Sequence, residues 1–72
     1  MVVRVLLYNT RNQLFFQPDQ NWSGDLCSAL DFGGMVPAVN LACERKFLKD
    51  TAVICEFDDP RFNMVLPLEA GH

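Results

Sequence analysis

The stretch DFGG, residues 31–34, has the residue types and spacing that most suggest chemistry. Its two glycines precede a segment with helical spacing, and backbone N–H groups at the start of a helix can bind an anion. The Lys-Ser/Thr pair of a P-loop is missing, and the magnesium role of a kinase DFG aspartate needs a far larger domain. We therefore expect Gly33 and Gly34 mainly to allow a tight turn into the helix, with Asp31 accepting nearby hydrogen bonds. An anion site at the two glycines is the alternative.

Three carboxylates, Glu56, Asp58 and Asp59, form a second candidate site. Paired carboxylates can transfer protons or bind a divalent cation. No histidine lies near them in the sequence, and they lack the spacing of an EF-hand, whereas Asp58-Asp59-Pro60 is typical of a turn. We therefore expect these residues to form a turn, and we expect no catalytic residue, no metal and no cofactor.

The three cysteines, Cys27, Cys43 and Cys55, could act as nucleophiles or metal ligands. They form no CxxC motif, and the only histidine that could activate a thiol is His72, the last residue of the sequence. We expect Cys43 and Cys55 to pack in the core as small apolar side chains. Cys27, in a predicted loop, is the thiol that remains open to reaction.

Phe16, Trp22 and Phe32 could form an aromatic interaction surface, because tryptophan is among the residues that dominate protein–protein hot spots. The other interpretation is structural, with Trp22 holding the long loop over residues 22–34 against the sheet. Both interpretations depend on where this loop lies, which the sequence leaves open.

The elements that would position these residues follow a simple order. Segments rich in β-branched and large apolar residues predict two hairpins, built from strands over 2–8, 13–17, 51–57 and 61–66. Between the hairpins, Pro37 fits the first turn of a helix of about three turns. We expect a single α+β domain over residues 1–72, with two layers in the order β-β-α-β-β. It would have a largely antiparallel sheet of about four strands, one helix packed on one face, and a frayed tail over 68–72.

The predicted strands are apolar on both sides. A sheet covered by a helix on only one face should alternate apolar and polar residues, yet the segments 2–7, 52–55 and 64–66 do not. The simplest cover for the second face is another copy of the chain, because twofold dimers are the commonest oligomers. The alternative cover is the loop over 22–34. We therefore expect a non-enzymatic protein-interaction module that forms a homodimer, with another protein as a further candidate partner.

Composition limits the class of protein. Apolar residues are 50% of the 72 residues and charged residues 21%, which is typical of a folded globular domain. The formal charge is −3, and the six basic residues are dispersed except near the predicted helix end. We therefore expect no nucleic-acid partner. No apolar run reaches the roughly 20 residues of a membrane span and no secretory leader is apparent, so we expect no membrane partner and a cytoplasmic location with free thiols.

Several short motifs follow one another along the chain: Trp22, ALDFG at 29–33, PAVNLA at 37–42, CEFDDPRF at 55–62 and LPL at 66–68. In this pattern the chain resembles small uncharacterised bacterial proteins that have a tryptophan, a short alanine-rich helix and a final strand pair around an F-x-DP turn. The resemblance implies an α+β fold and a bacterial origin. It implies no particular activity and no functional residues.

Overall fold

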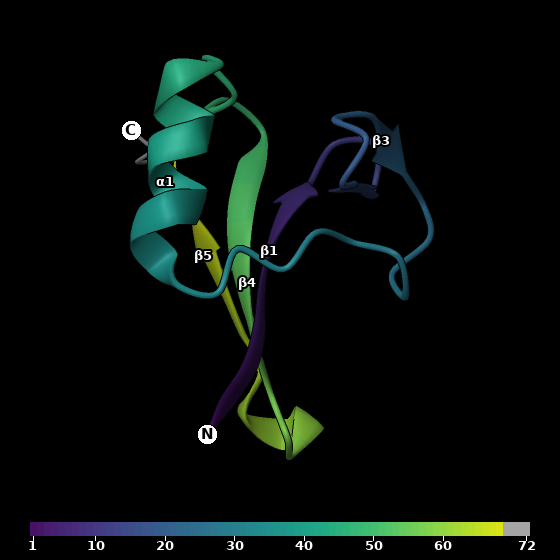
Figure 1. Cartoon of the computed structure of the whole chain (residues 1–72), viewed down its shortest axis with the longest axis vertical. Coiled ribbons are helices and arrows are strands. Elements are labelled where there is room, and N and C mark those ends of the chain that lie inside the picture. Colours follow the sequence, from purple (N-terminus) through teal and green to yellow (C-terminus); the bar gives the residue numbers. More distant parts are fainter. Residues whose placement is uncertain (69–72) are drawn as a thin grey trace.

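The computed structural model of the protein describes residues 1–68 as a five-stranded antiparallel sheet with one α-helix (Figure 1). The elements in chain order are β1 (Val2–Asn9), β2 (Leu14–Phe16), β3 (Trp22–Ser23), α1 (Met35–Glu44), β4 (Thr51–Phe57), η1 (Pro60–Phe62, a 3-10 helix) and β5 (Met64–Pro67). The strand order in the sheet is β3-β2-β1-β4-β5. The predicted α+β class is therefore confirmed, with five strands rather than about four. Within these residues no helix has the length and apolar character needed to cross a membrane.

β1 and β4 form the centre of the sheet, as their β-branched and large apolar residues predict. They pair from Val2 opposite Phe57 to Asn9 opposite Thr51, with a β-bulge just after Val2. β5 then returns along β4 after η1, in which Pro60 is the first residue. Proline fits that position because its missing N–H would have no partner there.

β3 corrects the prediction of a loop over residues 22–34 at the start of that segment. Trp22 and Ser23 pair with β2 in an antiparallel register. A two-residue strand is too short to give a period in the sequence, and it forms only because β2 lies beside it. The predicted frayed tail also begins too early, since Leu68 donates its N–H to the Thr51 carbonyl at 3.0 Å. The rest of that tail, 69–72, lies outside the described residues.

α1 begins at Met35, two residues before Pro37. Pro37 therefore lies in the first turn, as predicted, where the N–H that proline lacks would have no partner within the helix. Ala38 and Ala42, one turn apart, are fully buried, and their small side chains let the helix approach the sheet closely. The helix covers one face of β1 and β4 and leaves the end of the sheet near the N-terminus uncovered (Figure 1).

Two backbone hydrogen bonds close the C-terminal end of α1. The Lys46 N–H donates to the Cys43 carbonyl at 3.2 Å. The Phe47 N–H donates to the Ala42 carbonyl at 2.8 Å, which completes a Schellman motif. The motif requires a left-handed residue, and Lys46 adopts a φ of 60°, a conformation that glycine reaches with the least strain.

The main core lies between α1 and the sheet. Its buried members come from β1, β2, α1 and β4: Val5, Leu7, Phe16, Ala38, Ala42, Val53 and Cys55. Every second residue of each strand faces this layer, because side chains alternate along a strand. One face of the sheet is therefore packed as predicted.

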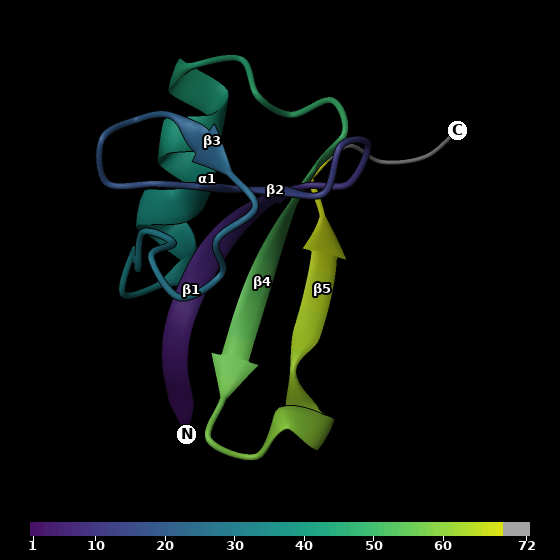
Figure 2. The same ribbon diagram turned by 90° about the vertical axis from the view of Figure 1, so that its right-hand side faces the viewer.

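The second face of the sheet is covered over β1, partly covered over β4 and open over β5. Figure 2 looks onto this face, with β2, β3 and the segment after β3 in front of β1. Leu6 and Ala52 are fully buried there, whereas Ile54 is half-buried and Val65 is 55% exposed. The apolar side chains of the segment 22–34, Trp22, Leu30 and Phe32, pack against the main core instead, and the second face over β5 remains exposed.

The segment after β3 runs along the edge of β1 that β2 does not reach. The Phe32 N–H donates to the Val5 carbonyl at 2.8 Å, and the Val5 N–H donates to Asp31 Oδ1 at 3.0 Å. The Leu30 N–H donates to the Phe16 carbonyl at 2.9 Å, and Ala29 is buried beside them. These bonds satisfy backbone groups that would otherwise form a free sheet edge.

Candidate functional site

The DFGG stretch leads the chain from the edge of β1 into α1. Asp31 Oδ1 accepts the N–H groups of Val5 at 3.0 Å and of Gly33 at 2.8 Å. These two hydrogen bonds lower the pKa of Asp31 from its ordinary value of 3.8. Gly33 has a φ of 76°, which favours glycine, and Gly34 is the N-cap without a side-chain hydrogen bond. A carboxylate thus already bonds one of the two glycine N–H groups that would serve an anion.

The aromatic residues proposed as an interaction surface lie together, but largely inside the protein. Phe16 is 1% exposed, and half-buried Trp22 packs edge-on against it at a centroid distance of 5.3 Å. Trp22 also contacts Phe47 at 5.4 Å, and Phe32 stacks on Phe16 at 6.2 Å. Phe16 therefore belongs to the core rather than to a surface, and Trp22 holds β3 against that core.

The exposure of the three thiols differs in part from the prediction. Cys55 is buried, as predicted, with its Sγ 3.4 Å from the Sδ of Met35. Cys43 is exposed, and so is Cys27. The prediction for Cys43 is wrong because Ala38 and Ala42 define the buried side of α1, and the next residue along a helix is turned about 100° away from that side.

The carboxylates form local pairs rather than one centre. Asp59 accepts the N–H of Arg61 at the start of η1 and pairs with its guanidinium at 2.6 Å, and these contacts lower the pKa of Asp59. Glu56 pairs with Arg4 across the strands at 2.7 Å. Within residues 1–68, no group of three His, Cys, Asp or Glu side chains is placed to hold a metal ion. His72 lies outside the described residues.

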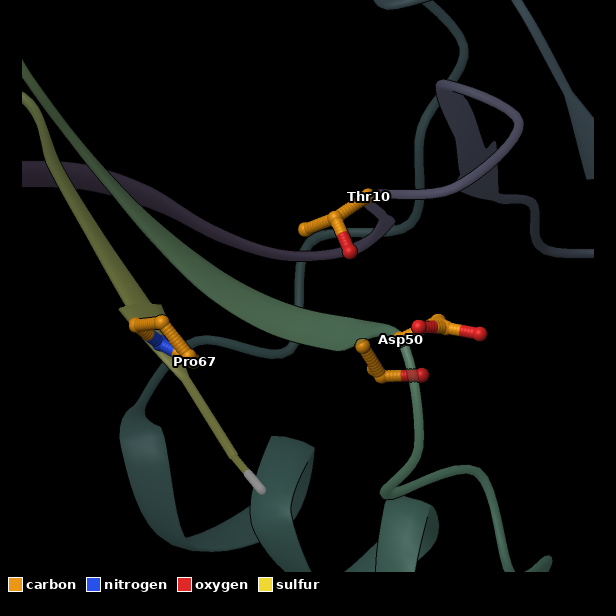
Figure 3. A pocket seen from close by; sticks show the side chains of 4 residues that line it. Thr10, Asp50 and Pro67 are labelled. Carbon is orange, nitrogen blue, oxygen red and sulfur yellow. The ribbon is translucent and has the colours of Figure 1, made fainter. Parts of the chain in front are cut away.

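One hollow of about 190 Å³ lies where β1 ends and β4 begins, and Thr10, Asp50, Thr51 and Pro67 line it. Figure 3 shows Pro67 on β5, across the hollow from Thr10 and Asp50. The Thr51 hydroxyl donates to the Lys49 carbonyl at 3.2 Å, and the Thr10 N–H donates to the Asp50 carbonyl at 2.8 Å. One carboxylate and two hydroxyls provide neither a nucleophile with an adjacent base nor a set of cation ligands.

The most distinctive surface is apolar and lies at the end of the sheet beyond α1. We name it the apolar end; it comprises the exposed residues Val2, Val3, Met35, Val36, Phe62 and Met64. They come from the starts of β1, α1 and β5 and from η1. Figure 1 shows the starts of β1 and β5 and η1 at the end of the molecule near the N-terminus, with the start of α1 nearer the middle. Met35 of α1 contacts Cys55, the residue opposite Met64. Val36 is 69% exposed and Phe62 63%. Sequence reasoning missed this surface because it depends on where α1 begins relative to the sheet.

β5 adjoins the apolar end and is an edge strand of the sheet. Its residues Met64 and Val65 are exposed on opposite faces. In the part of the chain that the structure describes, no strand pairs with its outer side. Edge strands expose unpaired N–H and C=O groups that can pair with a strand of another chain.

Comparison of the chain with protein-family models, with curated proteins and with solved structures found no match.

Proposed function

We propose that this protein is a non-enzymatic interaction module that self-associates as a homodimer, with the apolar end and the adjoining β5 as its contact surface. The concentration of exposed apolar side chains at one end carries this proposal. All the exposed large apolar residues in 1–68 belong to the apolar end or adjoin it, except Leu26 and Leu48. Contiguous apolar patches on small soluble proteins commonly mark interaction sites.

The charges near this surface do not oppose association. Asp59 pairs with Arg61 beside Phe62, and Arg4 pairs with Glu56 on the central strands. Because each pair is neutral as a unit, two copies can approach without an unpaired charge from these groups being buried. The formal charge of −3 for the whole chain is also small.

The size of the domain favours a partner as well. A chain of 72 residues buries only about 60% of its unfolded surface, so its stability margin is narrow. Burying apolar area against a partner, at about 25 cal/mol per Å², would add to that margin. The three free thiols support a reducing compartment such as the cytoplasm.

Sedimentation equilibrium of surface variants tests the contact surface. Replacing Phe62 and Met64 with serine removes two exposed apolar side chains beside β5, and we expect the dissociation constant of the dimer to rise about tenfold or more. Leu48→Ser is the matched control, because Leu48 is an exposed leucine between α1 and β4, away from the apolar end. We expect that control to dimerise like the wild type.

Two outcomes would contradict the proposal in different ways. A double variant that dimerises as tightly as the wild type would mean that the apolar end is not the contact surface. A wild-type chain that stays monomeric at every concentration would contradict self-association itself. Circular dichroism of each variant confirms that the fold is retained.

A further inference from the structure

The hydrogen bonds around β4 determine which backbone groups of β5 point outward. In an antiparallel pair, the N–H and C=O of one residue face the neighbouring strand and those of the next residue face away. The Leu68 N–H donates to the Thr51 carbonyl, and the Phe57 N–H donates to Asn63 Oδ1 at 2.7 Å. The odd-numbered residues of β4 therefore point their backbone groups toward β5.

The other side of β4 gives the same alternation. Val5 lies opposite Cys55, and the N–H and C=O of Val5 are both bonded to residues 31–32. Val5 thus faces away from β4, and Cys55 faces away from β1. The hydrogen bonds on the β1 side and on the β5 side of β4 therefore agree about which β4 residues face each neighbour.

On β5, Met64 and Leu66 lie opposite odd-numbered residues of β4 and bond with that strand. Val65 and Pro67 therefore point their backbone groups outward. Pro67 has no N–H to offer, which is why proline is compatible with this position of an edge strand. Within β5, Val65 alone presents both an outward N–H and an outward carbonyl.

We infer that two copies of the chain pair through antiparallel β5 strands, with the twofold axis at Val65. Each Val65 donates its N–H to the Val65 carbonyl of the other copy, and the two sheets continue as one ten-stranded sheet. This inference rests on the self-association proposed above and assigns the contact to β5, the strand that adjoins the apolar end.

The available backbone donors and acceptors favour this register over the two with the axis at Leu66 or at Met64. If the axis lay at Leu66, the Val65 carbonyl would face Pro67 of the other copy, which has no N–H. If the axis lay at Met64, the Val65 carbonyl would face Asn63, whose N–H already donates to the Pro60 carbonyl at 3.2 Å. Of these three registers, the axis at Val65 is the one that satisfies both of its backbone groups.

The side chains of β5 favour a second copy as the occupant. In this register Met64 of each copy lies opposite Leu66 of the other, so apolar residues meet across the axis. Val65, 55% exposed, lies beside its own counterpart on the second face of the sheet. The outer side of β5 therefore complements itself in both its hydrogen bonds and its side chains.

The other edges of the sheet are less suited to pairing. Asp31 and Phe32 already hydrogen-bond the backbone of Val5 on the part of β1 that β2 does not reach. β3, at the opposite edge of the sheet, has only two residues. β5 is also short, with four residues, so the interface belongs to the small, weak class. We therefore expect a dimer that dissociates on dilution.

Amide hydrogen exchange of the wild-type protein, followed by NMR, tests the geometry directly. If the outward Val65 N–H bonds only in the dimer, its exchange slows as the protein concentration rises from low micromolar to millimolar. With about 90% of the chains paired, exchange through the monomer is about tenfold slower. The Leu66 N–H bonds within the chain, so it provides the internal reference and should depend on concentration much less.

Two substitutions at Val65 separate the backbone donor from the side chain. Val65→Pro removes the outward N–H without removing a bond to β4, and we expect it to abolish dimerisation. Val65→Thr keeps the N–H and the β-branched shape, and we expect it to dimerise within about threefold of the wild type. If Val65→Pro does not fold, the exchange measurement on the wild type decides alone.

The outcomes distinguish this inference from the proposed function. A wild-type dimer whose Val65 amide exchanges at the same rate at all concentrations would overturn the β5 pairing but leave self-association intact. A dimer of unchanged affinity in a folded Val65→Pro variant would do the same, and would point to packing of the apolar end alone. A wild-type monomer throughout would overturn both.

Discussion

Asp31 Oδ1 lies 3.0 Å from the amide nitrogen of Val5, where a strand carbonyl would lie if β2 extended along this part of β1. With the Phe32 N–H on the Val5 carbonyl, the side chain and the backbone together replace that strand. The DFGG stretch therefore protects a sheet edge and then turns the chain into α1. With this part of the β1 edge occupied, the free edges of the sheet are those of its terminal strands, β3 and β5. β5, with four residues, is longer than β3, with two.

Replacing Asp31 with alanine should destabilise the fold. The Val5 and Gly33 N–H groups would lose their acceptor, and we expect the free energy of unfolding to fall by about 1 kcal/mol, since the side chain is exposed and water partly compensates. Urea denaturation measures the change. Glu44→Ala, an exposed carboxylate at the end of α1, is the control and should change stability by less than about 0.5 kcal/mol. Equal stability of Asp31→Ala and wild type would mean that the edge is not held by this carboxylate.

The stability of the protein should fall in acid partly through Asp31. Its pKa in the folded state is lowered by the hydrogen bonds from Val5 and Gly33, relative to an ordinary 3.8. The stabilisation is therefore fully present above that ordinary value and is lost as the pH falls through the lower folded pKa. Asp31→Asn keeps an oxygen acceptor but does not titrate, so its stability should decline less steeply below pH 3.8. Parallel pH profiles for variant and wild type would contradict the assignment.

Lys46→Gly should stabilise the protein. Lys46 has a φ of 60° in the Schellman motif that ends α1, and glycine adopts this conformation with less strain. We expect the free energy of unfolding to rise by about 0.5–1 kcal/mol. Lys49→Gly is the matched control, because Lys49 has no positive φ, and it should give no gain. A loss of stability in Lys46→Gly would show that the lysine side chain contributes more than the strain removes.

Two neighbouring positions of α1 should differ in their tolerance of a larger side chain. Ala42→Leu inserts three carbon atoms between helix and sheet at a fully buried site, and we expect a loss of about 1–3 kcal/mol. Cys43→Leu places the same side chain on the exposed side of the helix and should change stability by about 0.5 kcal/mol at most. Thermal or urea denaturation of the pair measures the difference. The reverse order would mean that the helix is rotated about its axis.

Local patterns were sufficient to predict most of the elements. The apolar segments around 2–8 and 51–57 have the β-branched residues of central strands, and Pro37 limits where the helix can begin. Each of these properties resides in a few consecutive residues, so it is visible without knowledge of the tertiary contacts. The α+β class follows from their order.

The surface could not be predicted in the same way. Phe16 is a candidate for an interaction surface by its residue type alone, but β3 and α1 enclose it, and their positions depend on distant contacts. The bonds between Asp31 and Val5 join residues 26 positions apart. Whether a side chain is exposed, or a strand edge is free, is thus decided by long-range packing rather than by local sequence.

The molar mass of the wild-type protein in solution tests the central claim most directly. Light scattering over a concentration series, from low micromolar to millimolar, should show the mass rising from 8.2 kDa towards twice that value as two copies pair. A mass of 8.2 kDa at every concentration would contradict self-association.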